Sequence, residues 1–305
     1  MKKKKIRSKT KIHDENLINK LKDVFEEEPR ISIRRAALRV KDDNVDVSIS
    51  TTQRNHKENK IKPYKITKKH RLLELDYRKR CEFSNFILNK IYEDEHFTDY
   101  LIFTDEAWLS LTCDINSQNC RYWSSINPDQ YIEMPLHDQK IMIFAAITSG
   151  HVIEPIFFES CVNQHTYHDM IINEFIPKLK RAYENQIDHL IYQQDSAPAH
   201  VTNKVLSKLR EIFNDNLITK NGWLNGMAEW LPRSPDLTPC DFFLWGFLKS
   251  KLCGKKFSTI QELKNELIKQ FEKLNQNKLL LKRVFGNFVK RCYLCIGTEG
   301  RHFKI

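Results

Sequence analysis

Residues 189–200 read HLIYQQDSAPAH, and this stretch decides how the rest of the chain folds. Its first half is an apolar run that predicts a buried strand ending at Asp195, and a proline-containing turn then begins a helix. Residues 165–186, just before it, place isoleucine, leucine and phenylalanine at helical spacing, which predicts an amphipathic helix. A helix between two strands forms a crossover, so the sequence predicts a strand–helix–strand unit here.

The segments on either side of this unit indicate an α/β protein. Stretches rich in β-branched and aromatic residues predict strands that form a mainly antiparallel meander, at residues 100–112, 121–123, 140–148 and 151–160. Helical patterns predominate afterwards, at residues 199–213, 239–253, 259–274 and 277–292, and Ser258 or Thr259 is the expected N-cap of the third. Strands followed by alternating helices and strands predict an α/β sheet flanked by helices.

The first seventy residues differ from the rest of the chain in charge. The chain has 305 residues and a net charge of +11. Of its 50 basic and 39 acidic side chains, residues 1–70 hold 21 and 10, which leaves 29 of each for the remainder. A segregated positive segment attracts a polyanion such as DNA. Charge alone is equally compatible with a solvated basic arm.

Three short helices are expected in this basic segment. Apolar residues at helical spacing mark residues 16–27, Ser32 is a suitable N-cap for residues 33–40, and a third helical stretch covers residues 50–59. Three such helices suggest a helix-turn-helix, in which the last helix lies in the major groove of DNA. The candidates for DNA contact on that helix are Thr51, Thr52, Gln53, Arg54 and Lys57. The alternative is a small basic helical cap that reads no sequence.

These patterns divide the chain into three parts. A basic helix-turn-helix segment covers residues 1–62, a linker and helix cover residues 63–98, and the main α/β domain covers residues 99–305. The apolar runs are far shorter than the roughly 20 residues of a membrane-spanning helix, so we expect no membrane partner. Residues 2–5 and Arg7 are basic and match the pattern of a nuclear localisation signal, which predicts a nuclear protein.

The first candidate catalytic residue is Asp105, in the segment FTDEAW. Side chains alternate between the two faces of a strand, so Asp105 shares the face of Leu101 and Phe103. Glu106 points to the opposite face for the same reason. Asp105 is therefore the better candidate of this pair of acids.

Two further segments supply the other candidates. Asp195 ends a buried strand, and ligands of α/β proteins bind at such carboxyl ends. The segment PRSPDLTPCDFFLW holds Asp236 and Asp241, and Pro239 sets the start of a helix that carries Asp241 in its first turns. Carboxylates from separate elements suit Mg²⁺, which prefers oxygen ligands, and two such ions can catalyse phosphoryl transfer on DNA. Taken singly, each aspartate is better explained by a helix cap or a turn.

The local sequences around these aspartates carry a family resemblance. The segments FTDEA, QQDSAPAH and PRSPDLTPCDFFLW resemble the successive catalytic motifs of mariner-like transposases, and the resemblance extends over about residues 68–303. It implies a mixed sheet of the RNase H and retroviral-integrase class. It also implies that Asp105, Asp195 and Asp241 bind two Mg²⁺ or Mn²⁺ ions, with Asp236 mainly structural and His200 as a supporting residue.

The resemblance implies a function as well. A mariner-like enzyme would bind the terminal inverted repeats of a transposon as a homodimer, cut the DNA strands and transfer their ends into target DNA, with no small-molecule cofactor. Two helix-turn-helix units are usual in that family, whereas this sequence has room for one, so we expect a truncated DNA-binding segment. The alternative is an inactive or domesticated relic that acts only as a DNA-binding protein.

Overall fold

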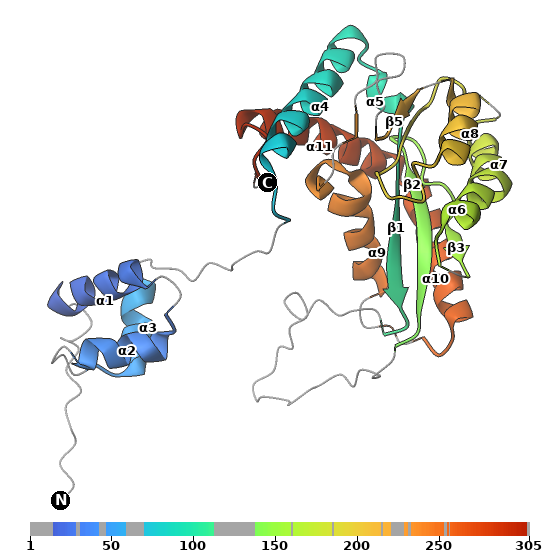
Figure 1. Cartoon of the computed structure of the whole chain (residues 1–305). Helices are drawn as coiled ribbons and strands as arrows, with labels where there is room; N and C mark the ends of the chain where they lie inside the picture. Colours follow the sequence, from blue (N-terminus) through green and yellow to red (C-terminus); the bar gives the residue numbers. More distant parts are fainter. Residues whose placement is uncertain are drawn as a thin grey trace, which may run out of the picture. The chain divides into compact units, whose positions relative to one another are not determined.

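The computed structural model describes residues 15–28, 31–42, 47–58, 70–112, 138–159, 161–184, 186–214, 216–220, 229–230, 233–252, 255 and 257–303. The chain divides into two compact units, Met1–Lys69 and His70–Ile305 (Figure 1). We describe each unit by itself.

The first unit contains the three predicted helices. They are α1 (Glu15–Glu27), α2 (Ile33–Asp42) and α3 (Ile49–Glu58). Ser32 accepts a hydrogen bond from the Arg35 amide at 3.3 Å, and Ser48 accepts one from the Thr51 amide at 3.1 Å. These bonds cap α2 and α3 and confirm Ser32 as an N-cap. One small core holds the unit together, formed by Leu17, Leu21, Val24, Ala36, Ala37, Val40 and Val47.

The second unit is built on a mixed five-stranded sheet with the order β3-β2-β1-β4-β5. Its strands are β1 (Leu101–Ser110), β2 (Lys140–Ile147), β3 (Ile156–Phe158), β4 (Ile191–Gln193) and β5 (Leu217–Ile218). Strands β1 to β3 pair antiparallel, as the predicted meander requires, whereas β4 runs parallel to β1 and β5 parallel to β4. The predicted α/β sheet is confirmed.

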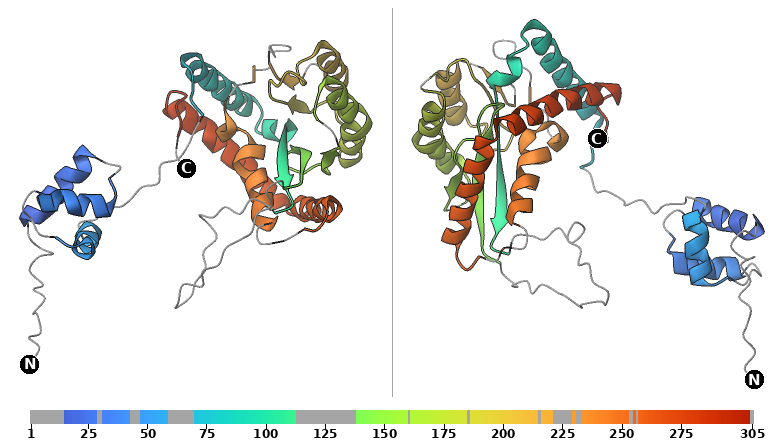
Figure 2. Two further views of the ribbon diagram at one scale, coloured as in Figure 1. Left: turned by 60° about the horizontal axis from the view of Figure 1, so that its bottom comes forward. Right: turned by 180° about the vertical axis from the view of Figure 1, so that it is seen from behind.

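Helices cover both faces of this sheet (Figures 1 and 2). On one face lie α4 (Glu74–Glu93), α9 (Trp245–Leu252), α10 (Ile260–Gln276) and α11 (Lys278–Gly297). On the other face lie α6 (Gln164–Met170), α7 (Ile176–Ala182) and α8 (Asn203–Phe213). The short helix α5 (Phe97–Tyr100) leads directly into β1.

Alternate residues of each strand enter two separate cores. Leu101 and Phe103 of β1 belong to the core beneath α4, α9, α10 and α11, and Ile102 belongs to the core beneath α6, α7 and α8. The same alternation divides Ile191 from Tyr192 on β4. The period of two residues in a strand therefore fixes which face each functional side chain reaches.

Some predicted boundaries were wrong. Strand β5 was missed because its two residues are too short to produce a periodic signal. The strand predicted at residues 151–160 pairs only over Ile156–Phe158, with one isolated bridge between Ile147 and Val152. Thr202 caps α8, so this helix begins later than residue 199. The predicted strand at residues 121–123 lies outside the described residues.

Two of the predicted helices contain a π-helical turn. Ile171–Phe175 forms one between α6 and α7, and Cys240–Leu244 forms the other immediately before α9. Turns of this kind are rare and frequently occur at functional sites. The second turn carries Asp241.

Asp76 anchors the start of α4, and its replacement provides a stability test. Its carboxylate accepts a hydrogen bond from the Leu73 amide at 2.7 Å and pairs with Arg233 at 2.8 and 3.0 Å. The Arg233 hydrogen bond, opposed by burial and aided by the Leu73 amide, lowers the pKa of Asp76.

We therefore expect Asp76→Asn to lower the Tm by roughly 2–6 °C at pH 7, the size of a lost helix cap. A carboxyl group with a lowered folded-state pKa stabilises the protein above its unfolded-state value, and that contribution is lost as the pH falls through the folded-state value. The Tm difference between the two proteins should therefore shrink below about pH 4 in thermal melts. A difference that stayed constant down to pH 2 would contradict this role for the charge.

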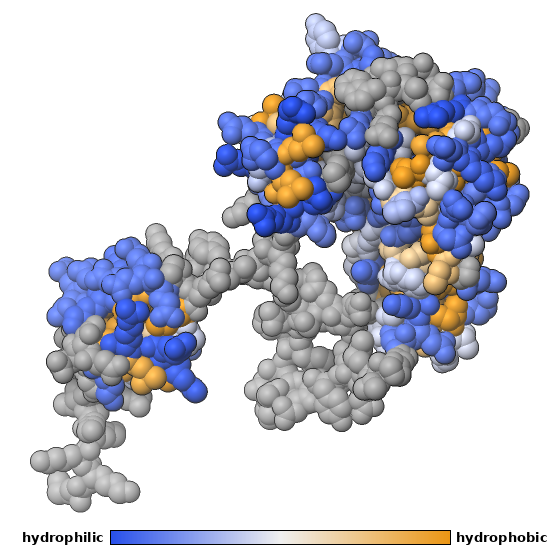
Figure 3. Space-filling model, viewed as in Figure 1, coloured by the Kyte–Doolittle hydropathy of each residue, from blue (hydrophilic) through white to orange (hydrophobic). Residues whose placement is uncertain are grey.

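On the face that Figure 3 shows, hydrophilic residues cover most of the described surface of both units. Within the described residues, no helix combines the length and the apolar character that crossing a bilayer requires.

Candidate active site

The three predicted catalytic aspartates line one cleft of about 430 Å³. Asp105 comes from β1, Asp195 follows β4, and Asp241 comes from the π-helical turn before α9. The cleft is also lined by His70, Thr104, Gln193, Ser196, Ala197, Trp230, Arg233, Ser234, Pro235 and Thr238. Three separate elements thus bring carboxylates to the same place, as the sequence predicted.

The parallel pairing of β1 with β4 explains why two of the aspartates meet. Phe103 is opposite Gln193 in the register of the two strands. Continuing this register by two residues brings Asp105 beside Asp195. The predicted alternation also holds, because Asp105 lines the cleft, while Glu106 lines a different pocket on the other face of the sheet.

Asp105 is held in place by an aromatic side chain. Trp245, the first residue of α9, donates a hydrogen bond from its indole Nε1 to Asp105 Oδ2 at 2.7 Å. Burial raises the pKa of Asp105, and the nearby charge of Asp195 adds to this rise, although the Trp245 hydrogen bond opposes it. A cation placed between the carboxylates would reverse the effect of their mutual repulsion.

Of the three cleft aspartates, Asp241 has the pKa that is shifted furthest from its usual value. Its side chain still reaches solvent, but burial by the walls of the cleft, followed by the charges of Asp105, Asp195 and Asp236, raises its pKa to about 7. Like charges crowded into one site produce such a rise when no cation compensates them. Strongly perturbed carboxyl groups in a cleft are typical of functional sites.

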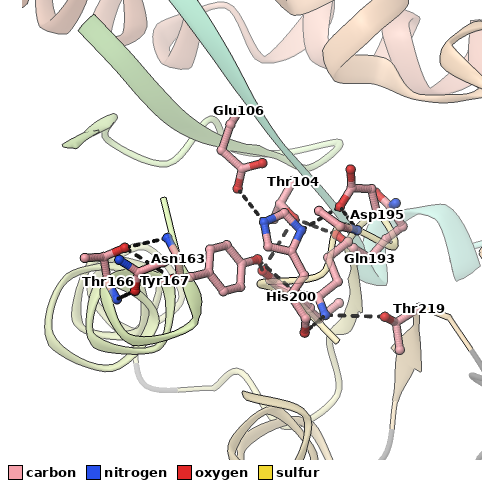
Figure 4. Close-up of polar contacts among 12 residues, drawn as sticks. Thr104, Glu106, Asn163, Thr166, Tyr167, Gln193, Asp195, His200 and Thr219 are labelled. Carbon is pink, nitrogen blue, oxygen red and sulfur yellow. Dashed lines mark hydrogen bonds and ion pairs between the residues drawn. The ribbon is translucent and has the colours of Figure 1, made fainter. Parts of the chain in front are cut away.

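Asp195 is held from the opposite face of the sheet by a histidine. His200 Nδ1 lies 2.5 Å from Asp195 Oδ1, and its Nε2 lies 3.5 Å from Glu106 Oε1 (Figure 4). Asp195 Oδ1 also accepts the amide hydrogen of Ala197 at 2.9 Å. Both bonds end on Oδ1, and neither of them uses Oδ2.

The contacts among His200, Asp195 and Glu106 shift the pKa of each of these side chains. Burial opposes the charge on His200, but the hydrogen bond to Asp195 and the charges of Glu106 and Asp195 outweigh it and raise the pKa of His200. Burial would also raise the pKa of Asp195, but His200 and the Ala197 amide lower it. Burial raises the pKa of Glu106 to about 7, against the effect of His200. Asp195 is therefore the aspartate of the cleft that most readily stays ionised.

A buried polar network fixes the histidine ring. Tyr167 of α6 stacks on His200, with ring centroids 4.0 Å apart and an interplanar angle of 25° (Figure 4). The Tyr167 hydroxyl donates to Gln194 Oε1 at 2.9 Å, and Gln194 Nε2 donates to the His200 carbonyl at 2.9 Å and to Thr219 at 3.3 Å. Satisfied buried networks of this kind keep their members in one orientation.

Asp236 has a different role from the three cleft aspartates. Its two carboxylate oxygens accept bonds from Arg80 Nη1 at 2.7 Å and Nη2 at 2.6 Å, and the Arg80 side chain is completely buried. Arg80 also donates to the Gly300 carbonyl and to Ser234. Asp236 thus joins α4, the segment before Asp241 and the end of α11, which supports the predicted structural role.

The candidate DNA-contacting residues on α3 fall into three groups. Gln53 and Arg54 are exposed, and Thr51 is half-buried with its hydroxyl 2.9 Å from that of Ser48. Thr52 is completely buried, and its hydroxyl donates to the Ser48 carbonyl at 3.2 Å, so it is removed from the candidate DNA-binding surface. The side chain of Lys57 lies outside the described residues.

The residues of the cleft suit a divalent metal ion by their chemistry. Carboxylate oxygens are the ligands that Mg²⁺ and Mn²⁺ take in proteins, and the three carboxylates of the cleft leave negative charge for a cation to neutralise. Across the described ranges, no group of three or more His, Cys, Asp or Glu side chains is arranged so that it could hold a metal ion as it stands. The cleft therefore offers a matching donor set rather than a finished coordination sphere.

Sequence reasoning missed several residues around the cleft. Glu106 was set aside because it points to the opposite face, yet through His200 it reaches Asp195. Tyr167 and Trp245 lie in two of the predicted helices but were not singled out. Their polar atoms carry the contacts that matter here, and apolar periodicity does not report which buried aromatic residue has a polar partner.

The cleft and fold can be compared with known proteins. No protein-family model matches the chain. Human histone-lysine N-methyltransferase SETMAR is 22% identical over 291 residues, which cover 93% of this chain and 39% of that protein. The chain thus spans about two fifths of the length of this relative.

Solved structures match over a larger share of their own length. The Mos1 mariner paired-end complex with Mg has a TM-score of 0.73 at 20% identity, covering 100% of this chain and 84% of that one. The catalytic domain of Mos1 mariner transposase has a TM-score of 0.59 at 20% identity, covering 78% of this chain and all of that one. These matches confirm the predicted RNase H-like fold preceded by a helical segment, and the predicted resemblance to mariner transposases extends to the three-dimensional structure.

Proposed function

We propose that this chain, which shares the fold of the mariner transposases, is itself a metal-dependent DNA transposase that cuts DNA strands and transfers their ends to target DNA. One observation carries the proposal, namely that Asp105, Asp195 and Asp241 line a single cleft. The fold alone would be compatible with many activities, so the function rests on the chemistry of this cleft.

Within this proposal the three carboxylates hold the metal ions. Two Mg²⁺ or Mn²⁺ ions would supply activation of the attacking oxygen and neutralisation of the leaving oxygen in an in-line displacement. Trp245 orients Asp105 and His200 orients Asp195 through the hydrogen bonds described above. Arg233 also lines the cleft, but its guanidinium is already paired with Asp76, so it offsets little of the negative charge of the three carboxylates.

The first unit would bind DNA. Gln53 and Arg54 are exposed on α3, the helix expected to enter the major groove, with Thr51 beside them. The DNA partners would be transposon inverted repeats and target DNA. A paired-end complex of the Mos1 mariner protein matches this chain, which supports the proposal of a homodimer that holds two ends. The basic amino-terminal residues support the proposal of a nuclear location.

Strand cleavage of a defined duplex tests this function. Residues 1–305 are incubated with a duplex that carries an inverted repeat taken from the DNA on either side of the reading frame, and with a scrambled duplex of equal length. We expect nicks at the repeat end in Mg²⁺ or Mn²⁺ and none in EDTA.

The alternative, a DNA-binding relic, makes the opposite prediction for the same samples. It would shift the repeat duplex in a gel and leave both strands intact in either metal. That result would remove the enzymatic part of the proposal and keep the DNA-binding part.

A further inference from the structure

One oxygen atom beneath the cleft is buried without a partner. Gln193, the last residue of β4, is only 1% exposed. Within the described residues, its side-chain Oε1 has no hydrogen-bond partner. Burying an acceptor without a donor costs folding free energy, so such a group in a native protein requires an explanation, such as backbone strain, a catalytic role, or a bound water or ion.

The position of Gln193 places its side chain on the face of the sheet that carries the cleft. Side chains of β4 alternate, so Gln193 shares the face of Ile191, and Gln194 shares the face of Tyr192. Gln193 lines the cleft together with the three aspartates, while Gln194 turns to Tyr167 on the other face. The backbone carbonyl of Gln193 accepts a bond from Thr104 at 2.8 Å, which fixes the strand position from which the side chain extends.

We propose that Gln193 Oε1 is a fourth oxygen donor of the cleft, which serves the divalent cation directly or through one bound water. The inference rests on the proposed function, because it assigns a further residue to the same metal centre. It explains why an otherwise unfavourable buried acceptor lies next to three carboxylates.

The chemistry of the cleft favours a neutral donor at this place. Mg²⁺ and Mn²⁺ take about six oxygen ligands, more than three singly bound carboxylates provide. The cleft already holds three carboxylates, and their like charges repel one another. An amide oxygen adds a ligand without a fourth negative charge.

The neighbouring residue Gln194 provides a matched control. It has the same side chain and the same 1% exposure, but its amide is fully engaged with Tyr167, His200 and Thr219. Replacement by methionine removes the amide at nearly constant volume in both positions. Gln194→Met leaves several buried partners unsatisfied, whereas Gln193→Met removes an oxygen for which the described residues supply no partner.

The test is a titration of full-length protein with MnCl₂ alone, followed by calorimetry and by the electron paramagnetic resonance of free Mn²⁺. We expect Gln193→Met to keep or raise the metal-free Tm and to weaken Mn²⁺ binding by about 10–100-fold, the usual effect of losing a supporting ligand. Gln194→Met should lower the metal-free Tm and weaken Mn²⁺ binding less than Gln193→Met does.

A second variant keeps the test decisive if Gln193→Met folds poorly. Gln193→Glu retains an oxygen at the same position and should bind Mn²⁺ more tightly than Gln193→Met does. Wild-type affinity in Gln193→Met, or a Gln193→Glu variant as weak as the methionine variant, would overturn the inference. If Asp195→Asn bound Mn²⁺ as well as the wild type, the metal centre itself, and with it the proposed function, would be wrong.

Discussion

Asp195→Asn is expected to reduce metal-dependent nicking by at least about 10³-fold, because the stabilisation that bound metal gives the transition state amounts to several kcal/mol. Asparagine is nearly isosteric and can still accept the hydrogen bonds of His200 and Ala197, so the fold should survive. Asp105→Asn and Asp241→Asn should each cause a loss of similar size. Single-turnover nicking of a repeat duplex measures all three.

The matched control is Asp169→Asn, which changes an exposed carboxylate on α6 that does not line the cleft. It should nick at the wild-type rate. If all three cleft variants nicked as fast as this control, the assignment of the metal centre would be wrong.

Asp241→Asn should also change how the Tm depends on pH when no metal is bound. The pKa of Asp241 is raised to about 7, so in the folded protein its carboxylate is destabilising above that pH. The variant should therefore melt above the wild type at pH 8 in EDTA. Because the folded wild type takes up a proton between about pH 7 and pH 4, this advantage should disappear over that range.

Asp236→Ala is expected to act on stability rather than on metal binding. The substitution leaves the guanidinium of Arg80 buried without its counter-ion, which costs about 3–5 kcal/mol of unfolding free energy. For a unit of this size that loss corresponds to a Tm lower by roughly 6–20 °C. Thermal melts measure it, and a Mn²⁺ titration at low temperature should still give near wild-type affinity.

A control for this prediction changes Arg80 together with Asp236. The double variant Arg80→Met with Asp236→Leu removes both charges together and should recover part of the lost stability, since an apolar pair avoids the cost of burying ions. Normal stability with lost nicking in Asp236→Ala would show that Asp236 belongs to the metal centre. The choice of Asp241 over Asp236 would then have to be reversed.

Much of the architecture was predictable because it depends on local periodicity. The alternation along residues 100–112 placed Asp105 and Glu106 on opposite faces, and the helical spacing of residues 165–186 predicted the crossover to β4. The two-residue strand β5 could not be predicted, because its pairing depends on contacts distant in sequence. The same limit applies to the boundaries of α8 and β3.

The residues of the candidate site likewise fall into a predictable group and an unpredictable group. Local sequence motifs identified the three aspartates, and the structure brings them to one cleft. The residues that orient them were not predictable, because Trp245 lies 140 positions from Asp105 and Tyr167 stacks on His200 only after the sheet has formed. Thr52 was selected for its place on a helix, and its burial appears only when three helices pack together.

Because the side chains of β1 enter two separate cores, the orientations of two cleft carboxylates can be engineered separately. Asp105 is oriented by Trp245, which belongs to one core, whereas Asp195 is oriented by His200 against Tyr167, which belongs to the other. Substitutions that repack α9 should alter one metal-facing carboxylate, and substitutions that repack α6 should alter the second. An engineer could therefore adjust the two sides of the reaction centre in separate libraries and combine the best members afterwards, since sites with no shared contacts contribute nearly additively.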